Sequence, residues 1–269
     1  MFIVADIGGT KTRVAGSDDA SHIGEPVMFD TPQNFEEGMR RLHEAAFAIA
    51  PDGPQRAVVG VPGILTQTRD SLFRAPHLPQ WQDVNIKKRL ETELACPVAL
   101  LNDAALVALG EAHFGAGRGF PIVGYVTVST GIGGARIVDG AIDKSLYGFE
   151  PGHRLLSVHG KLQELEAVVS GAALQEKYGE QPTHIRNPAL WEELTTILSQ
   201  ELYNLILDWS PDCLVLGGSL FKEGGFTVQA IEKKLTALNV SFPTLPALKP
   251  AELGDIGGLY GGIAYLAQQ

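Results

Sequence analysis

The chain has 269 residues, enough for one or two domains. Hydrophobic residues make up 45% and charged residues 19%, a composition typical of a globular protein and not of a disordered or fibrous one. The net charge of −10 disfavours general binding to nucleic acid. Residues 87–89 form the densest basic cluster, which we interpret as a solvated helix face.

Two further features restrict the class of protein. Cys96 and Cys213 are too few for a disulfide framework or a four-thiolate metal site, and both adjoin apolar runs typical of a core. No apolar stretch approaches the roughly 20 residues that a membrane span needs, and the first residues do not resemble a signal peptide. We therefore expect a soluble, cytoplasmic protein with neither membrane nor nucleic acid as a partner.

One pattern occurs twice along the chain. A strand, a glycine turn and a returning strand are predicted at 2–5, 8–12 and 13–15, and again at 122–128, 129–134 and 135–138. Each hairpin precedes a helical pattern (35–50 and 190–209) and then a buried strand that ends in small residues (57–63 and 213–219). The repeat predicts a duplicated α/β unit with a ligand cleft between the halves. Two unrelated α/β segments are the alternative.

The link between the halves and the C-terminus also show clear patterns. A strand at 97–101 leads to Asn102-Asp103 at a helix N-cap position, followed by a helix over 104–114. Residues 257–266 have helical spacing despite four glycines, and such small residues allow close packing.

The first glycine turn has the features of a phosphate site. Backbone N–H groups of Gly8 and Gly9 can cradle phosphate oxygens, and Thr10 and Lys11 add donors. Asp6 ends the preceding strand, where a carboxylate can hold Mg²⁺ directly or through water. An ordinary hairpin turn with a capping Asp gives the same pattern, so both interpretations stay open here.

The second turn carries Thr130 and Gly131 in a matching place, and two such turns predict nucleotide phosphates held between them. Gly217 and Gly218 follow a buried strand and would let an adenosine lie against bare backbone. A simple helix-start turn is the alternative at that position.

Several polar residues are candidates for binding and activating a sugar. A carboxylate at a helix N-terminus stays ionised, so Asp103 is the best candidate for a general base, with Asn102 beside it to hold a neighbouring hydroxyl. A plain N-cap pair is the alternative. Glu150, His153 and Glu166 offer the donors and acceptors that a polyol needs. A structural role is also open for His153, and we interpret the other six histidines as surface residues.

Taken together, these residues resemble the ROK family of sugar kinases in the actin/hexokinase/Hsp70 ATPase superfamily. The resemblance runs in order through eight motifs, namely DIGGTKT (6–12), GVPG (60–63), NDA (102–104), GEAHFGAG (110–117), STGIGG (129–134), ExGH (150–153), LEAVVSG (165–171) and LVLGGS (214–219). It implies an α/β fold of two RNase H-like (actin-like ATPase) domains with an interdomain cleft. The implied domains are 1–104 plus 256–269 and 105–255.

The resemblance also implies ATP-dependent phosphorylation of a hexose hydroxyl, with glucose as the leading substrate. Asp103 would be the base, and Asp6 would help to place Mg²⁺. The implied sugar-binding residues are Gly63, Asn102, Asp103, Glu150, His153 and Glu166. The implied nucleotide-binding residues are Gly8, Gly9, Thr10, Lys11, Thr130, Gly131, Gly217 and Gly218. A homodimer is implied by the family alone. Kinases for N-acetylmannosamine, N-acetylglucosamine or fructose, and a non-catalytic sugar-binding regulator, are the alternatives.

Four departures from the family pattern bear on the substrate. Many members carry a zinc loop, C-x-C-G-x-x-G-C-x-E, where this chain has Ser157, His159 and Glu164 at the cysteine places, so we expect no structural zinc. Leu101 and Ala105 replace the polar residues that flank Asn102-Asp103. Phe149 places a bulky ring beside Glu150 and could change which hexose fits. The region between 171 and 191 looks shortened.

Overall fold

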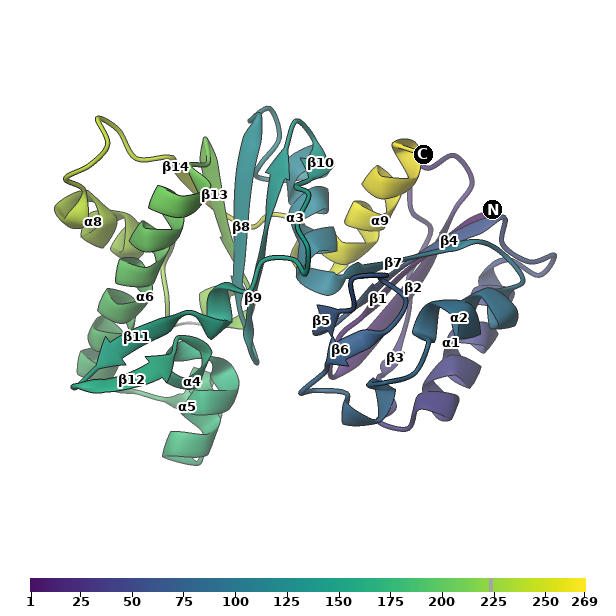
Figure 1. Ribbon diagram of the computed structural model, residues 1–269, viewed down its shortest axis with the longest axis horizontal. Helices are drawn as coiled ribbons and strands as arrows, with labels where there is room; N and C mark the ends of the chain where they lie inside the picture. Colours follow the sequence, from purple (N-terminus) through teal and green to yellow (C-terminus); the bar gives the residue numbers. More distant parts are fainter. Residues whose placement is uncertain (223–224) are drawn as a thin grey trace. The chain divides into compact units, whose positions relative to one another are not determined.

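The computed structural model describes residues 1–222 and 225–269. The chain forms two compact units (Figure 1). Unit 1 comprises Met1–Phe114, Lys144–Gly148 and Asp255–Gln269, and unit 2 comprises Gly115–Asp143 and Phe149–Gly254. The expected domains differ in giving residues 105–114, 144–148 and 255 to the second half, and those boundaries stay a prediction, as does the cleft.

Unit 1 is built on a mixed five-stranded sheet in the order β3-β2-β1-β4-β7. Its strands are β1 (Phe2–Ile7), β2 (Lys11–Ser17), β3 (Val27–Asp30), β4 (Arg56–Val61) and β7 (Val98–Asn102). β2 pairs antiparallel with both β1 and β3, whereas β4 pairs parallel with both β1 and β7. A two-stranded sheet of β5 (Ile64–Leu65) and β6 (Leu72–Arg74) follows β4.

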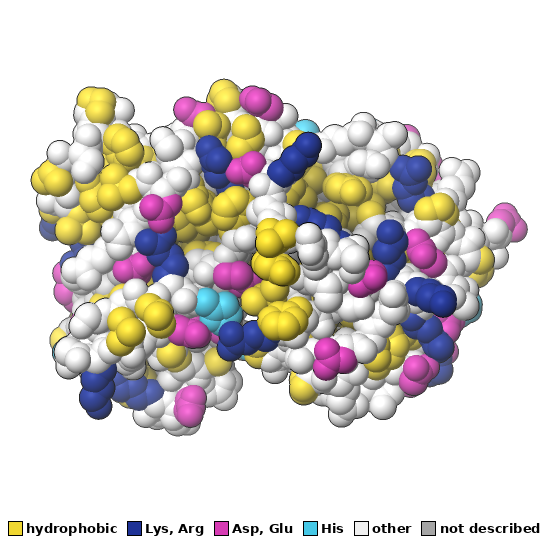
Figure 2. Space-filling view, in the orientation of Figure 1, with side chains coloured by type: hydrophobic (Ala, Val, Ile, Leu, Met, Phe, Trp, Pro, Cys, Tyr) yellow, Lys and Arg dark blue, Asp and Glu magenta, His cyan; other side chains and the backbone are white. Residues whose placement is uncertain are grey.

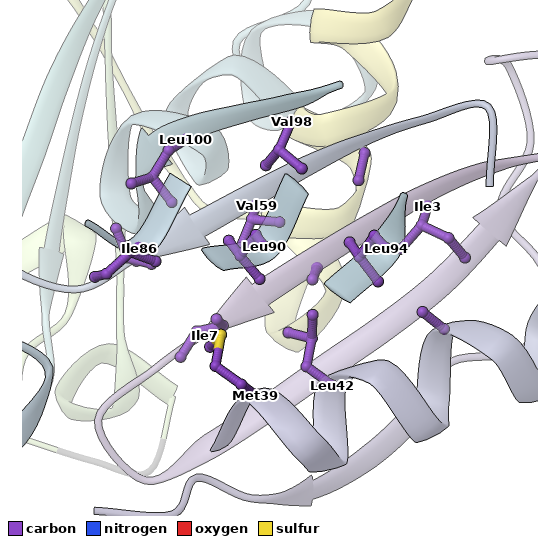
Figure 3. Packing of buried hydrophobic residues seen from close by; sticks show 14 of the residues in the cluster. Ile3, Ile7, Met39, Leu42, Val59, Ile86, Leu90, Leu94, Val98 and Leu100 are labelled. Carbon is purple, nitrogen blue, oxygen red and sulfur yellow. The ribbon is translucent and has the colours of Figure 1, made fainter. Parts of the chain in front are cut away.

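Helices cover both faces of this sheet because strand side chains alternate between them. On one face, Ile3 and Ile7 pack with α1 (Phe35–Ile49) and α2 (Ile86–Leu94), as Figure 3 shows. On the other, Val4 lies against Gly262 of α9 (Gly257–Ala267), which packs on α3 (Asp103–Phe114). A Cβ at Gly261 would lie 1.8 Å from the carbonyl oxygen of Leu106, so the glycines of α9 permit this close helix contact.

Unit 2 repeats the same sheet with the order β10-β9-β8-β13-β14. Its strands are β8 (Ile122–Val128), β9 (Ile132–Val138), β10 (Ala141–Ile142), β13 (Cys213–Gly217) and β14 (Ala247–Pro250), and a separate hairpin joins β11 (Leu155–Val158) and β12 (Lys161–Glu164). Its helices are α4 (Glu166–Val169), α5 (Gly171–Tyr178), α6 (Pro188–Trp209), α7 (Ser219–Lys222) and α8 (Val228–Leu238). The duplicated α/β unit predicted from the sequence is thereby confirmed.

The predicted helices over 35–50, 104–114, 190–209 and 257–266 are confirmed to within two residues. Both glycine turns are shorter than predicted, since the returning strands already begin at Lys11 and Ile132. Among the described residues, none of the helices is long and apolar enough to span a membrane. Acidic and basic side chains are interspersed on the face shown in Figure 2.

Candidate active site

The first glycine turn joins β1 to β2 and is braced by one residue from beyond β3. Gly8 N–H donates to the Lys11 carbonyl at 2.9 Å, while the Thr31 hydroxyl donates to the Gly8 carbonyl at 2.8 Å and Thr31 N–H to the Thr10 carbonyl at 2.9 Å. The Thr12 hydroxyl donates in turn to the Thr31 hydroxyl at 2.9 Å, and both side chains are buried. These bonds hold the turn's carbonyl groups on the protein side.

The donors of this turn are available to a ligand. In the part of the chain that the structure describes, the N–H groups of Gly9 and Thr10 have no hydrogen-bond partner. Successive N–H groups without partners form the kind of concave site that binds phosphate oxygens. The turn therefore fits a phosphate group.

Two side chains near the turn differ from expectation. The Lys11 ammonium is ion-paired with Asp30, its register partner across β2 and β3, so a phosphate would compete with Asp30 for it. His77 is half-buried and not a surface residue as predicted, since a Cβ at Gly9 would lie 2.8 Å from the His77 Cβ. His77 thus forms a wall of the turn.

Asp6 is the penultimate residue of β1 and lies in a space left by two glycines. A Cβ at Gly258 would lie 2.5 Å from the Asp6 carboxylate, and one at Gly60 would lie 3.5 Å from it. Burial raises the pKa of Asp6 to about 6, an effect that the nearby positive charge of Arg13 only partly offsets. No hydrogen bond joins the Asp6 carboxylate to a described residue. A desolvated carboxylate of this kind fits a hard divalent cation.

Asn102 and Asp103 lie at the junction of β7 and α3. The Asn102 side chain accepts a hydrogen bond from Ala105 N–H at 2.9 Å and donates one to the Gly63 carbonyl at 3.2 Å. Asp103 Oδ1 accepts from Ala104 N–H at 2.8 Å. The predicted N-cap is thus confirmed, and the Asn102 side chain links the start of α3 to the Gly63 carbonyl.

Only glycine suits position 63. Its φ of +109° is unfavourable for other residues, and a Cβ there would lie 2.3 Å from the Arg74 carbonyl oxygen. The backbone at Gly63 can therefore pass close to β6 while the Gly63 carbonyl group accepts a hydrogen bond from Asn102.

The second glycine turn joins β8 to β9 and is bound by residues far along the chain. Gly171 N–H donates to the Ser129 carbonyl at 2.7 Å, and Ala172 N–H donates to the Thr130 carbonyl at 3.0 Å. The Glu166 carboxylate accepts from Ile132 N–H at 2.6 Å. The start of α4 and α5 therefore fixes this turn.

The segment after β13 reaches the same turn from another side. Ser219 N–H donates to the Ser129 hydroxyl at 3.1 Å. Gly218 has a φ of +98°, and a Cβ there would lie 2.2 Å from the Val128 carbonyl oxygen. Because α7 begins at Ser219, the helix-start interpretation of this segment is confirmed. Gly217 is buried, and a Cβ there would lie 2.9 Å from the Tyr125 hydroxyl, so of the two glycines only Gly218 is partly exposed.

The three acidic and imidazole residues predicted to bind a sugar in unit 2 lie around the short 3₁₀ turn Pro151–His153. Glu150 immediately precedes that turn, and its carbonyl group accepts from His153 N–H at 3.2 Å. A Cβ at Gly152 would lie 3.3 Å from Oε2 of Glu166. Unit 2 therefore brings Glu150, His153 and Glu166 together.

The ring of Phe149, expected beside the sugar-binding acid, packs against the Trp209 ring of α6. The two centroids lie 5.0 Å apart with the planes at 66°. The Phe149 backbone also forms a β-bridge to Gly134 of β9. These contacts anchor the Glu150 loop on unit 2.

The residues at the cysteine places of the zinc loop have other partners. His153 Nδ1 and Glu164 Oε2 lie 2.8 Å apart, and His159 Nε2 and Glu193 Oε1 lie 2.7 Å apart. Across residues 1–222 and 225–269, no group of three or more His, Cys, Asp or Glu residues is arranged to hold a metal ion.

The sequence interpretation missed Thr31, His77 and the pairing of His153 with Glu164. No sequence pattern links Thr12 with Thr31, which are 19 residues apart. The candidate residues form one set in unit 1 (Asp6, Gly8, Gly9, Thr10, Lys11, Gly63, Asn102 and Asp103) and one in unit 2 (Thr130, Gly131, Glu150, His153, Glu166, Gly217 and Gly218).

Comparison with known proteins supports the relationship. The ROK family profile matches residues 2–269. A glucokinase of Thermotoga maritima is 31% identical over 186 residues, which are 65% of this chain and 58% of that protein. An N-acetyl-D-glucosamine kinase of Pasteurella multocida is 27% identical over 96% of this chain and 97% of that protein.

A solved structure agrees with both units of the fold. The ROK glucokinase of Streptomyces griseus, in complex with glucose and AMPPNP, matches with a TM-score of 0.81 and 26% identity over 100% of this chain and 99% of that one. The chain belongs to the ROK family and is a sugar kinase of that family.

Proposed function

We propose that this kinase transfers the γ-phosphoryl group of ATP to the 6-hydroxyl of glucose, with Asp103 as general base. The observation that carries the proposal is the position of Asp103 at the first residue of α3, where it is bonded to Ala104 N–H and follows Asn102, which donates to the Gly63 carbonyl. The helix dipole favours the ionised carboxylate there. The glucose and AMPPNP bound to the relative from Streptomyces griseus support the pair of substrates.

In the proposed reaction, Asp103 accepts the proton of the sugar hydroxyl while the hydroxyl oxygen attacks the γ-phosphorus. The bond from the γ-phosphorus to the β,γ-bridging oxygen breaks, and ADP leaves with that electron pair. Transfer of this kind depends mainly on positioning and on neutralising charge. If Asp103 did not take the proton, the attacking hydroxyl oxygen would carry a positive charge once its bond to phosphorus forms.

The nucleotide is held by backbone groups in this proposal. In unit 1, the N–H groups of Gly9 and Thr10 donate hydrogen bonds to phosphate oxygens of the nucleotide. In unit 2, Thr130 and Gly131 supply the matching donors. Gly217 and Gly218 flank the adenosine. When bound, Mg²⁺ neutralises phosphate charge, and Asp6 is the side chain that would hold it, directly or through water.

The sugar is recognised by groups that can both donate and accept hydrogen bonds. Asn102 keeps one amide hydrogen free of its Gly63 and Ala105 bonds, because those use the other hydrogen and the oxygen. Glu150 and Glu166 supply acceptors for hydroxyl groups, and His153 supplies a ring nitrogen. N-acetylglucosamine is the second candidate substrate, supported by the relative from Pasteurella multocida that matches over nearly its whole length.

The test of this proposal is whether the 6-hydroxyl of glucose is the group that is phosphorylated. Incubation with Mg-ATP and glucose, followed by ³¹P and ¹³C NMR of the sugar product, is expected to give glucose 6-phosphate. The analogue 6-deoxyglucose is expected to give no sugar phosphate and to inhibit competitively. Phosphate on another carbon, or phosphorylation of 6-deoxyglucose, would contradict the proposed attack by O6.

A further inference from the structure

Glu164 stands where many ROK proteins have the last cysteine of a zinc loop, and here it contacts a candidate sugar-binding residue. Its Oε2 lies 2.8 Å from Nδ1 of His153. The two side chains are only partly exposed, at 23% for His153 and 39% for Glu164. The carboxylate is thus placed to act on the imidazole ring.

The chemistry of the pair sets the tautomer of the ring. An ionised carboxylate can only accept hydrogen bonds, so Nδ1 of His153 must carry the proton that is shared with Glu164. In the neutral ring, Nε2 then bears a lone pair and accepts a hydrogen bond. No described residue makes a hydrogen bond to Nε2. A sugar hydroxyl is a donor that suits this atom.

Both partners are attached to a rigid support. Arg154, next to His153, bonds through its guanidinium to Glu201 at 3.2 Å and to Asp208 at 2.6 Å, both on α6. Leu165, next to Glu164, is buried, and its N–H donates to the Arg154 carbonyl at 2.9 Å. The backbone that follows His153 is therefore bonded directly to the backbone that follows Glu164.

The β11–β12 hairpin also helps to position Glu164. Its four register pairs run from Leu155 with Glu164 to Val158 with Lys161. Leu156 and Val158 point into the hydrophobic core of unit 2. The hairpin thereby holds Glu164 in place by packing and strand pairing.

We propose that Glu164 is a positioning residue, which fixes the orientation and the Nδ1–H tautomer of His153 so that Nε2 accepts a hydrogen bond from the sugar. A carboxylate that orients a histidine in this way is a common device where the ring must present one particular nitrogen. This inference rests on the proposed function for the identity of the ligand, but the state of the ring is independent of it.

The chain offers a matched control. His159 and Glu193 form a second imidazole–carboxylate pair at 2.7 Å, at the tip of the same hairpin and with both side chains largely exposed. That pair contains no candidate sugar-binding residue. Glu193→Ala therefore removes a similar bond without touching His153.

The kinetic arm compares Glu164→Ala, Glu164→Gln and Glu193→Ala, with glucose as the varied substrate. We expect Glu164→Ala to raise the KM for glucose about tenfold while the KM for ATP stays within about twofold. Glu164→Gln keeps an oxygen that can accept from Nδ1, so it should recover much of the loss. Glu193→Ala should behave as the unaltered protein. Equal glucose KM values for Glu164→Ala and Glu193→Ala would overturn the proposal.

A spectroscopic arm reads the ring directly. Two-bond ¹H–¹⁵N NMR spectra of the full chain, at a pH well above the usual imidazole range, distinguish the two neutral tautomers, with the His153→Asn spectrum assigning the signals. We expect Nδ1–H for His153 in the unaltered chain and in Glu164→Gln, whose amide oxygen can still accept from Nδ1, and a change toward Nε2–H in Glu164→Ala. An Nε2–H ring in the unaltered chain would overturn the proposal.

The two arms separate the two hypotheses. Absence of turnover with glucose would count against glucose as the substrate, whereas the tautomer of His153 still decides the positioning role. If Glu164→Ala fails to fold, the tautomer of His153 in the unaltered chain carries the test.

Discussion

The two sheets of the molecule match strand for strand but differ in where they carry charge. Both have three antiparallel strands followed by two parallel ones, so β1 corresponds to β8 and β4 to β13. In unit 1, Asp6 pairs with Gly60, whereas Thr127 pairs with Gly217 at the same place in unit 2. The repeat therefore supplies equivalent glycine turns, and only unit 1 has a carboxylate at the end of the first strand.

The turns also differ in how they are held. The first is braced by Thr31, which directly follows the edge strand β3 of its own sheet. The second is bound by three separate segments, through Glu166, through Gly171-Ala172 and through Ser219. Since Glu166 is also a candidate sugar-binding residue, we propose that unit 2 couples its glycine turn to its candidate sugar-binding residues.

The largest effect is expected for the base of unit 1. Asp103→Asn removes the proton acceptor but keeps a side chain of the same size, so turnover should fall by about 10²-fold or more while sugar affinity changes little. Steady-state kinetics and calorimetric titration with glucose measure the two quantities. Turnover near that of the unaltered protein would remove Asp103 from the role of base.

A glycine of unit 2 tests the tightly held turn. Gly218→Ala forces a Cβ against the Val128 carbonyl oxygen at a positive φ, and we expect a loss of about 2–3 kcal/mol in the free energy of unfolding. Gly160→Ala, also at a positive φ but with open space around it, should cost about 1 kcal/mol. Denaturant unfolding compares them, and equal losses would contradict the close approach.

We expect the Asp6 carboxylate to lower the stability of the folded chain while providing a ligand for Mg²⁺. Burial raises its pKa from the ordinary value of 3.8 to about 6, so the folded chain holds the proton more tightly than the unfolded chain does. Stability is therefore lost as the pH rises from about 4 to 6, and the full cost persists above pH 6.

Without Mg²⁺ at pH 7.5, Asp6→Asn should be more stable than the unaltered chain by about 1–3 kcal/mol, and the gain should vanish near pH 4. The same variant should lose most of its activity. For the unaltered chain, the Mg²⁺ requirement should rise below about pH 6, because a proton then competes for Asp6. Thermal melts and Mg²⁺ titrations at several pH values test this. A less stable Asp6→Asn at pH 7.5 would argue against burial as the cause of the raised pKa.

The smallest effect concerns the brace of the first turn. Thr31→Val leaves the Gly8 carbonyl and the Thr12 hydroxyl without their partner, which should cost about 1–2 kcal/mol and raise the KM for ATP. Thr31→Ser keeps the hydroxyl and should recover most of both. If valine and serine variants have the same KM for ATP, the hydroxyl does not hold the turn.

Local sequence patterns were sufficient to predict the elements of the fold that depend on residues close together in the chain. Glycine spacing predicted both hairpins, and Asn102-Asp103 predicted the start of α3. Pairings across long stretches of chain were beyond the sequence, because periodicity identifies a face but not its partner. Thr31 meets a turn 23 residues earlier, and His77 meets Gly9 from a loop far along the chain.

Ion pairs were a second feature that could not be predicted from the sequence. Lys11 was expected on phosphates, yet strand register brings it opposite Asp30. The zinc-loop cysteines are absent from the sequence, and the structure attaches this region through the contact of Phe149 with Trp209 and the bonds of Arg154 to α6. A missing motif could be recognised in the sequence, but its replacement needed the fold.

The measurement that tests the central claim most directly is ADP release from Mg-ATP with glucose, mannose, fructose, allose, N-acetylglucosamine and N-acetylmannosamine, each compared with Asp103→Asn. We expect glucose to give the highest rate of sugar-dependent ADP release and the variant to lose it. A higher rate with N-acetylglucosamine would keep the mechanism and change the substrate. No sugar-dependent release with any of the six, or equal release from the variant, would contradict a glucose kinase that uses Asp103 as its base.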